Sequence, residues 1–493
     1  MLLFGIDIGT SSIKVSVVDA ATQRCICSAH YPETEAAILS PKPGWAEQSP
    51  DGWWEHTKLA ILKLHAEKKY DPLDIAAIGI AYQMHGLVVV DKDQHVLRNS
   101  IIWCDSRAVE IGNKAFTAIG EEKCLAHLLN SPGNFTASKL AWVKENEPEV
   151  YDQIDKIMLP GDFIALKLTG NITTSISALS EGIFWDFRNN ELSKDMMKYF
   201  GFDNDLIPVC NNVFEEHGSL TRDVADALQL KEGIPVSYKA GDQPNNALSL
   251  NVLKPGEVAA TAGTSGVIYA VNDRLGFDPQ SRVNSFAHVN HTSDNTSIGT
   301  LLCINGAGFS YSDTRKKYAA GKTYAWMNEE ASKVKPGSDG LFILPFGNGA
   351  ERMLNNKTIG SVYFNYDESV HSAAHVFRAV QEGVGFAFRY GLDIMKENGI
   401  QPTVIRAGKA NMFLSDVFTD CFVNTLDIPV ELYDNDGSVG AAIGAGIGAG
   451  IYSSYADAFS ACKPIGRIEP TKAGKYNELY QTWRSILLRQ LNQ

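Results

Sequence analysis

The chain has 493 residues, of which 44% are apolar and 20% are charged. This length exceeds what one hydrophobic core supports, so two domains are expected. The net charge of −13 argues against nucleic acid as the main partner. Eight cysteines without a recognisable spacing favour a reducing cytoplasm, and no signal peptide is expected because the chain starts directly on an apolar strand.

Apolar runs bounded by turn residues predict the strands, which are residues 2–9, 13–20, 25–31, 75–83, 87–90, 234–242, 403–408 and 428–434. Helices are predicted after an N-cap at Ser49 and over residues 136–150, most of 184–230, 373–398, 439–451 and 473–491. Strands followed by alternating helix and strand, twice over, predict an α/β fold in two halves around a cleft.

A Gly-Thr-Ser turn between two apolar strands occurs twice, at residues 9–11 and 263–265. Such a turn lets backbone N–H groups and hydroxyls close around an anion. One copy alone is more often an ordinary hairpin. Repetition at half-chain spacing instead indicates a duplicated domain whose equivalent loops share one cleft. The pair therefore predicts a nucleotide-dependent phosphotransferase.

Two aspartates are candidates for the chemistry. Asp7 precedes the first turn, where a carboxylate beside a phosphate loop suits Mg²⁺; the alternative is a structural or capping aspartate. Asp242 ends a strand, where the catalytic groups of parallel sheets gather. It could accept the proton of an attacking hydroxyl, or it could only cap the following helix.

Polar side chains end two further apolar strands. Gln83, Met84 and His85 precede Gly86, and His85 could bind a polyol or be a buried structural histidine. Trp103 lies in a second polar cluster that also holds an Asp and an Arg, for which the alternative is a buried ion pair.

Glycines recur every fourth residue at Gly440, Gly444 and Gly448. On a helix they form one bare stripe, which allows close approach of a sheet, a helix or a ligand. The segment is too short and too rich in glycine for a membrane span.

The sequence resembles the FGGY family of carbohydrate kinases, within the actin, Hsp70 and hexokinase superfamily, over nearly the whole chain. The matching segments are residues 5–14, 45–54, 79–86, 101–107, 135–142, 240–247, 261–266, 378–388 and 438–446. The Gln-Met-His-Gly element is similar to that of the family's xylulokinases, and the Arg-Glu pair of its glycerol kinases is absent.

The resemblance implies an α/β fold of two actin/hexokinase-like (ribonuclease H-like) domains around a central cleft. Residues 1–250 would form the sugar-binding domain with the catalytic base, and residues 251–493 the nucleotide-binding domain. The implied reaction is phosphorylation of a pentulose, D-xylulose at O5, by ATP with Mg²⁺. A homodimer is left open, and neither a nucleic acid nor a membrane partner is expected.

The implied site residues fall into three groups. The catalytic pair is Asp242, as base, and Asp7, as metal ligand. The sugar would be bound by Gln83, Met84, His85, Trp103 and Asp242. The nucleotide would be bound by Thr10, Ser11, Ser12, Lys14, Gly263, Thr264, Ser265, Gly408 and Asn411.

Three departures from the family pattern are present: Asn134, Asn365, and a thinned glycine run over residues 406–411. The last leaves the preference for the nucleotide base open. Rival functions are a kinase for L-xylulose, ribulose, fuculose or another polyol, and a sugar sensor without turnover. The intact Asp7 and Asp242 favour the enzyme.

Overall fold

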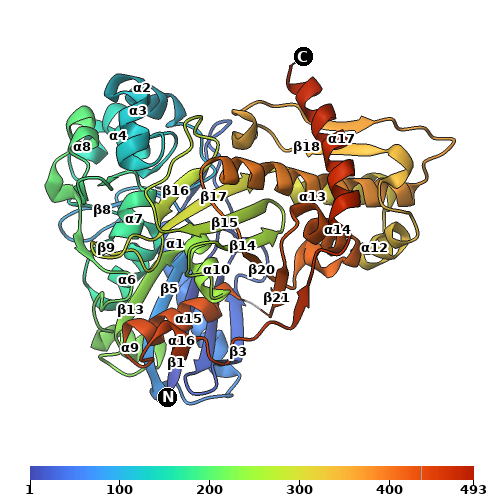
Figure 1. The fold of residues 1–493 in the computed structure, drawn as a ribbon. Helices are drawn as coiled ribbons and strands as arrows, with labels where there is room; N and C mark the ends of the chain where they lie inside the picture. Colours follow the sequence, from blue (N-terminus) through green and yellow to red (C-terminus); the bar gives the residue numbers. More distant parts are fainter. Residues whose placement is uncertain (435, 493) are drawn as a thin grey trace.

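The computed structural model describes residues 1–434 and 436–492. Two α/β halves each surround a central sheet (Figure 1). The first sheet has the order β13–β5–β1–β2–β3, with β1 Leu2–Ile8, β2 Ile13–Asp19, β3 Arg24–Tyr31, β5 Ile75–Tyr82 and β13 Val236–Gly241. The second has the order β16–β17–β15–β14–β20–β21–β22, with β14 Glu257–Ala262, β15 Gly266–Asn272, β16 Asn284–Ala287, β17 Ile298–Ile304, β20 Val404–Gly408, β21 Val430–Tyr433 and β22 Gly466–Ile468.

The two sheets repeat one topology. In the first, β1, β2 and β3 are antiparallel neighbours, and β5 and β13 continue parallel to β1. In the second, β14, β15 and β17 are antiparallel, and β20 and β21 continue parallel to β14. Each Gly-Thr-Ser turn therefore joins the first two strands of its sheet, as the duplicated sequence predicted.

Helices cover both sheets. The first half contains α1 Pro50–Ala66, α2 Val109–Ile119, α3 Glu121–Leu128, α4 Thr136–Asn146, α5 Pro148–Tyr151, α6 Pro160–Thr169, α7 Ile176–Glu181, α8 Lys194–Phe200, α9 Arg222–Leu228 and α10 Asp242–Ser249. The second contains α11 Ala307–Tyr318, α12 Tyr324–Ser332, α13 Ala373–Glu397, α14 Asp416–Leu426, α15 Gly437–Gly448, α16 Tyr455–Ala458 and α17 Ala473–Leu491. Short strands complete the fold: β4 Glu47–Gln48, β6 Val88–Val90, β7 Ser100–Ile101, β8 Lys156–Met158, β9 Thr173–Ser175, β10 Trp185–Asp186, β11 Glu191–Leu192, β12 Val209–Asn211, β18 Phe342–Phe346 and β19 Gly360–Phe364.

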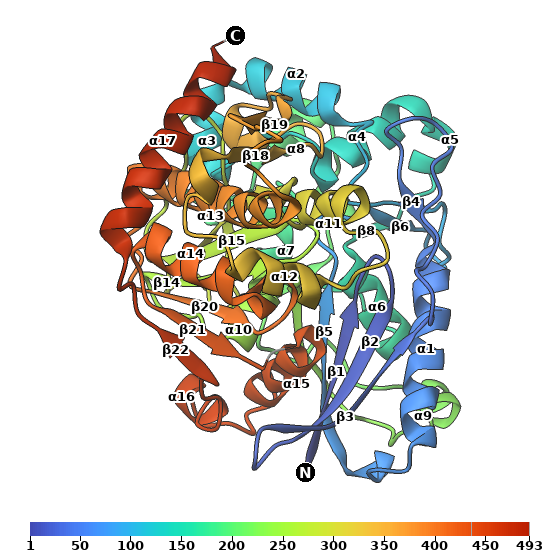
Figure 2. The same cartoon turned by 90° about the vertical axis from the view of Figure 1, so that its right-hand side faces the viewer.

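Helix α15 lies between β21 and β22 of the second sheet in the chain but packs on the first sheet, against β1, β5 and β13 (Figures 1 and 2). The contact requires glycine on both sides. A Cβ on Gly5 would lie 1.7 Å from the Ser438 carbonyl oxygen, and one on Gly448 would lie 1.8 Å from the Ser237 carbonyl oxygen. The bare stripe is therefore a packing surface. It also brings the start of α15 to β1, next to Asp7.

The prediction of a mainly helical segment over residues 184–230 was wrong. Only α8, α9 and a short 3₁₀ turn are helical there, and the segment also contains the strands β10, β11 and β12. The physical reason is local turn chemistry. The Asp186 carboxylate accepts hydrogen bonds from the backbone N–H groups of Arg188 and Asn189 at 3.0 Å, which closes a hairpin between β10 and β11.

One further expectation is confirmed. The Ser49 side chain caps α1 by accepting a hydrogen bond from the N–H of Gly52 at 3.1 Å. Within the described part of the chain, no helix is long and apolar enough to cross a bilayer.

Candidate active site

A cavity of about 420 Å³ lies between the two halves. The first half contributes Met84, His85, Trp103, Asp242 and Gln243 to its wall. The second half contributes Ser265, Val267, Arg282, Asn284, Leu301, Cys303, Asn305, Ala350, Arg352 and Asn356. The structure thus places four of the five predicted sugar-binding residues around one space, together with Ser265 of the second turn.

Gln83 lies behind this wall. Its side chain is buried and donates to the Gln48 Oε1 at 3.0 Å. The hydroxyl of Thr10 lies 3.4 Å from its Oε1, and that hydroxyl also accepts a hydrogen bond from the Trp103 indole at 2.9 Å. The half-exposed Trp103 ring is therefore linked directly to the first Gly-Thr-Ser turn.

The second turn is packed against α11. The Phe309 N–H donates to the Thr264 carbonyl at 2.9 Å, and a Cβ on Gly308 would lie 2.0 Å from the Gly263 carbonyl oxygen. Asn411 adopts a left-handed backbone with φ +53°. Its side-chain nitrogen would lie 3.5 Å from a Cβ on Gly263, so Asn411 adjoins this turn.

Lys14 pairs with Asp7 in the register between β1 and β2, and its ammonium forms an ion pair with Asp436, the N-cap of α15. The predicted nucleotide lysine therefore already has an acidic partner. Gly437 follows Asp436, and a Cβ there would lie 2.3 Å from the Asp7 Oδ2, so the start of α15 closes directly over Asp7.

Asp7 and Asp242 interact electrostatically. Burial raises the pKa of Asp7 to about 6, and the charge of Lys14 opposes this rise. Burial, and then the negative charge of Asp7, raise the pKa of Asp242 to about 7. Two buried carboxyl groups of which one raises the pKa of the other are a suitable donor set for a hard divalent cation, because Mg²⁺ takes few protein oxygens besides water and phosphate.

Asp242 is also the first residue of α10, so the strand end and the helix start coincide there. Its pKa near neutrality suits a general base, which must exchange protons at the working pH. The position of Asp242 at the start of α10 does not exclude the role of a base, because its side chain also lines the cavity.

Three site residues were missed in the sequence. Glu181, at the end of α7, is buried and contacts His85. Lys139, in α4, donates to the His85 carbonyl at 2.8 Å. Arg352 lines the cavity and forms no ion pair within residues 1–434 and 436–492. Lys139 lies in residues 135–142, which match the family pattern, and Arg352 lies in residues 346–356, which resemble the family's Gly-Glu-Arg loop. Nothing around Glu181 marks it.

The residue before Arg352 supports the cavity wall. The Glu351 carboxylate accepts hydrogen bonds from the N–H groups of Asn305 and Gly306, both at 3.0 Å. Burial raises its pKa to about 7. Since α11 begins at Ala307 and packs on Thr264, this carboxyl joins the cavity wall to the second turn.

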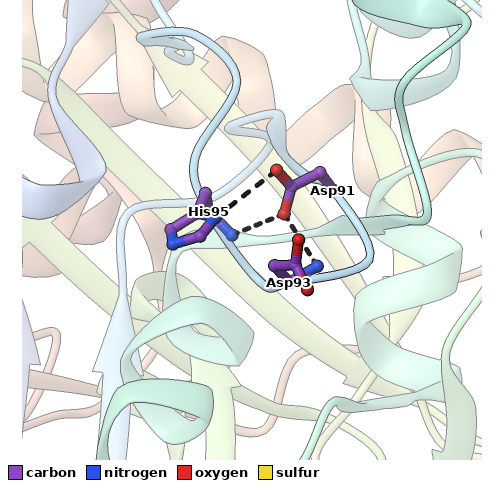
Figure 3. A group of neighbouring side chains, drawn as sticks. All are labelled: Asp91, Asp93 and His95. Atoms are coloured by element: carbon purple, nitrogen blue, oxygen red, sulfur yellow. Dashed lines mark hydrogen bonds and ion pairs between the residues drawn. The ribbon is translucent and has the colours of Figure 1, made fainter.

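Asp91, Asp93 and His95 also lie close together (Figure 3). They surround an exposed turn in which the Asp91 carboxylate accepts from the N–H groups of Asp93, at 2.9 Å, and His95, at 2.8 Å. This turn accounts for their proximity without a metal ion.

The family follows from comparison with known domains. Residues 2–249 match the N-terminal domain of the FGGY family of carbohydrate kinases, and residues 258–449 match the C-terminal domain. The chain therefore belongs to this family, and the protein is a carbohydrate kinase. The expected pair of actin/hexokinase-like domains around a cleft is confirmed.

The chain is 30% identical over 445 residues to the xylulose kinase of Escherichia coli K12, covering 90% of this chain and 88% of that one. Its fold is similar to that of a xylulose kinase from Rhodospirillum rubrum, with 24% identity, a TM-score of 0.88 and 100% of both chains covered. A gluconate kinase from Lactobacillus acidophilus gives 20% identity and a TM-score of 0.90, covering 99% of this chain and 98% of that one. The last two likenesses concern the fold alone.

Proposed function

We propose that this carbohydrate kinase transfers the γ-phosphoryl group of ATP to O5 of D-xylulose. The observation that carries the proposal is the position of Asp242, which shares one cavity with Met84 and His85 and interacts with Asp7. The similarity to xylulose kinases favours a ketose over glycerol or gluconate. The intact carboxylate pair favours an enzyme over a sensor.

In this proposal the sugar lies against Met84, His85 and Trp103. Asp242 accepts the proton of the attacking hydroxyl. Met84 supplies an adaptable apolar wall for the carbon chain. Because the cavity wall comes from both halves, their closure around the sugar would exclude water, which is a competing nucleophile.

The phosphates would be held between the two turns, by Thr10, Ser11 and Ser12 on one side and by Gly263, Thr264 and Ser265 on the other. Asn411 adjoins the second turn and Gly408 ends β20 three residues before it; both would contact the nucleoside. Asp7 would hold Mg²⁺ through water, and the ion would neutralise phosphate charge. Residues 1–250 thus supply the base and most sugar contacts, and residues 251–493 supply most nucleotide contacts.

Substrate choice is tested by ADP release with D-xylulose, L-xylulose, D-ribulose, L-fuculose, gluconate and glycerol. D-xylulose is expected to give the highest kcat/KM. A sugar whose mismatched hydroxyl loses one buried hydrogen bond should pay on the order of 1–3 kcal/mol, which lowers kcat/KM by roughly ten- to a hundredfold. A higher kcat/KM for any other compound in the panel would overturn the D-xylulose assignment.

The pH dependence tests the base. Asp242 must be ionised to accept a proton, so kcat/KM for the sugar should rise with pH, with a midpoint near its pKa of about 7, and level off above it. The negative charge of Asp7 contributes to that pKa, so Asp7→Asn should move the midpoint to lower pH. A profile that is flat between about pH 5 and 8 would exclude a base with this pKa.

A further inference from the structure

His85 is held in a strained backbone conformation by buried groups. Its φ is +63°, in the left-handed region that is unfavourable for a residue other than glycine. Its carbonyl accepts hydrogen bonds from the Lys139 ammonium at 2.8 Å and the Thr136 hydroxyl at 3.3 Å. Its N–H donates to the Glu181 Oε2 at 3.2 Å. The loop is therefore fixed from both sides of this one residue.

The Glu181 side chain is the centre of this arrangement. It is only 2% exposed, and its Oε1 accepts a hydrogen bond from the Tyr82 hydroxyl at 2.8 Å. Within the described chain it forms no ion pair with a lysine or arginine. A Cβ on Gly241, which precedes Asp242, would lie 3.4 Å from its Oε1. The carboxyl thus lies between the His85 loop and the strand end that carries the base.

The same residue determines which ring nitrogen of His85 carries the proton. Nδ1 lies 3.0 Å from the Glu181 backbone carbonyl oxygen. A carbonyl oxygen can only accept, so Nδ1 must be the donor. Burial, reinforced by the charge of Lys139, lowers the pKa of His85 to about 3, and the ring is neutral. Nε2 is then unprotonated and can only accept a hydrogen bond.

The ring is fixed in place, and Nε2 is left for a ligand. Phe135 and Phe286 pack on it, with ring centroids 4.7 and 5.4 Å away. Its side chain is 15% exposed, and His85 lines the cavity. Among the described residues, Nε2 has no hydrogen-bond partner.

We propose that Glu181 is a positioning residue that fixes His85 in the Nδ1–H tautomer, through its backbone carbonyl and its buried carboxyl, so that Nε2 accepts a hydrogen bond from one sugar hydroxyl. The inference rests on the proposed function in taking the ligand to be a sugar. It also constrains the orientation of the bound sugar. The ketone oxygen of a ketose can only accept a hydrogen bond, so it cannot be the group that donates to Nε2.

The tautomer is measured first, on the full-length protein without sugar, by ¹⁵N NMR of ring-labelled histidine. His85→Gln identifies the signal. The expected spectrum has a protonated Nδ1 and an unprotonated Nε2 for His85. A protonated Nε2, or a mixture of both forms, would overturn the proposal. Because no substrate is needed, this result is independent of whether any pentulose is phosphorylated.

Substrate analogues test the acceptor role in the wild-type enzyme. Ketoses that lack one hydroxyl, and their fluorinated counterparts, are compared with D-xylulose. For the hydroxyl that faces His85, both the deoxy and the fluoro compound should lose roughly tenfold or more in kcat/KM, because fluorine cannot donate. If at every position the fluoro compound retains the kcat/KM of the parent sugar, Nε2 does not accept a hydroxyl.

Glu181→Ala should raise the KM for the sugar by about tenfold or more, with a smaller effect on kcat and on the KM for ATP. Glu181→Gln, which keeps the size and one acceptor oxygen, should recover part of the loss. The matched control is Glu382→Gln, another buried glutamate, which binds Arg378 in α13 at 2.7 Å; it should leave the sugar KM near that of the wild type. An unchanged sugar KM in Glu181→Ala would contradict the positioning role.

Discussion

Asp242→Asn is expected to lower kcat by at least about a hundredfold, because the amide cannot accept the proton of the attacking hydroxyl. Asparagine has nearly the same size and keeps a polar group at the start of α10, so folding should be retained. The KM values for sugar and ATP should change much less than kcat, since the loss concerns the transition state. Steady-state kinetics together with a thermal unfolding curve measure both quantities.

The matched control for this variant is Asp416→Asn. Asp416 is the first residue of α14, as Asp242 is of α10, and it is exposed outside the cavity. If both variants lose the same activity, the charge at a helix start explains the effect. Near-normal turnover in Asp242→Asn would remove the base assignment altogether.

Asp7→Asn should produce the second large effect. Removing the charge should raise the Mg²⁺ concentration needed for half-maximal rate and lower kcat by roughly tenfold or more, while the sugar KM stays nearly the same. The physical reason is that Asp7 lies beside the first turn and under the start of α15, and it is not one of the residues that line the cavity with Met84 and His85. Mg²⁺ titrations at fixed ATP measure the shift.

Asp19→Asn is the matched control for Asp7. Asp19 ends β2, the neighbouring strand, and its carboxylate closes a turn by accepting a hydrogen bond from the Thr22 N–H at 2.7 Å. Its replacement should leave the Mg²⁺ titration near that of the wild type. If Asp7→Asn weakened sugar affinity alone, Asp7 would belong to the sugar side of the cleft.

The fold could be predicted largely from the sequence because its signals are local and repeated. The two Gly-Thr-Ser turns mark the first hairpin of each sheet, and the four-residue spacing from Gly440 to Gly448 marks a close packing surface. The surface proved to face the first sheet. No local sequence signal marks the packing of α15, a helix of the second half, on the first sheet. This packing depends on contacts such as that between Gly5 and Ser438, which are more than four hundred residues apart.

The site could be predicted only where polar residues interrupt an apolar pattern. Asp242, Met84 and His85 end strands and were found for that reason. Glu181 ends a helix of six residues and owes its position to tertiary packing against Tyr82 and His85. Arg352 reaches the cavity wall from a loop of the second half and not from the end of an apolar strand. The role of Gln83 also depends on distant partners, because its amide binds Gln48 rather than lining the cavity.

The most direct test is a structure of the protein with D-xylulose, Mg²⁺ and a non-hydrolysable ATP analogue. The account predicts O5 of the sugar within about 2.6–3.2 Å of an Asp242 oxygen, His85 on another hydroxyl, and both Gly-Thr-Ser turns at the phosphates. A sugar bound outside the cavity of Met84 and His85, or a nucleotide that contacts neither or only one of the two turns, would contradict it.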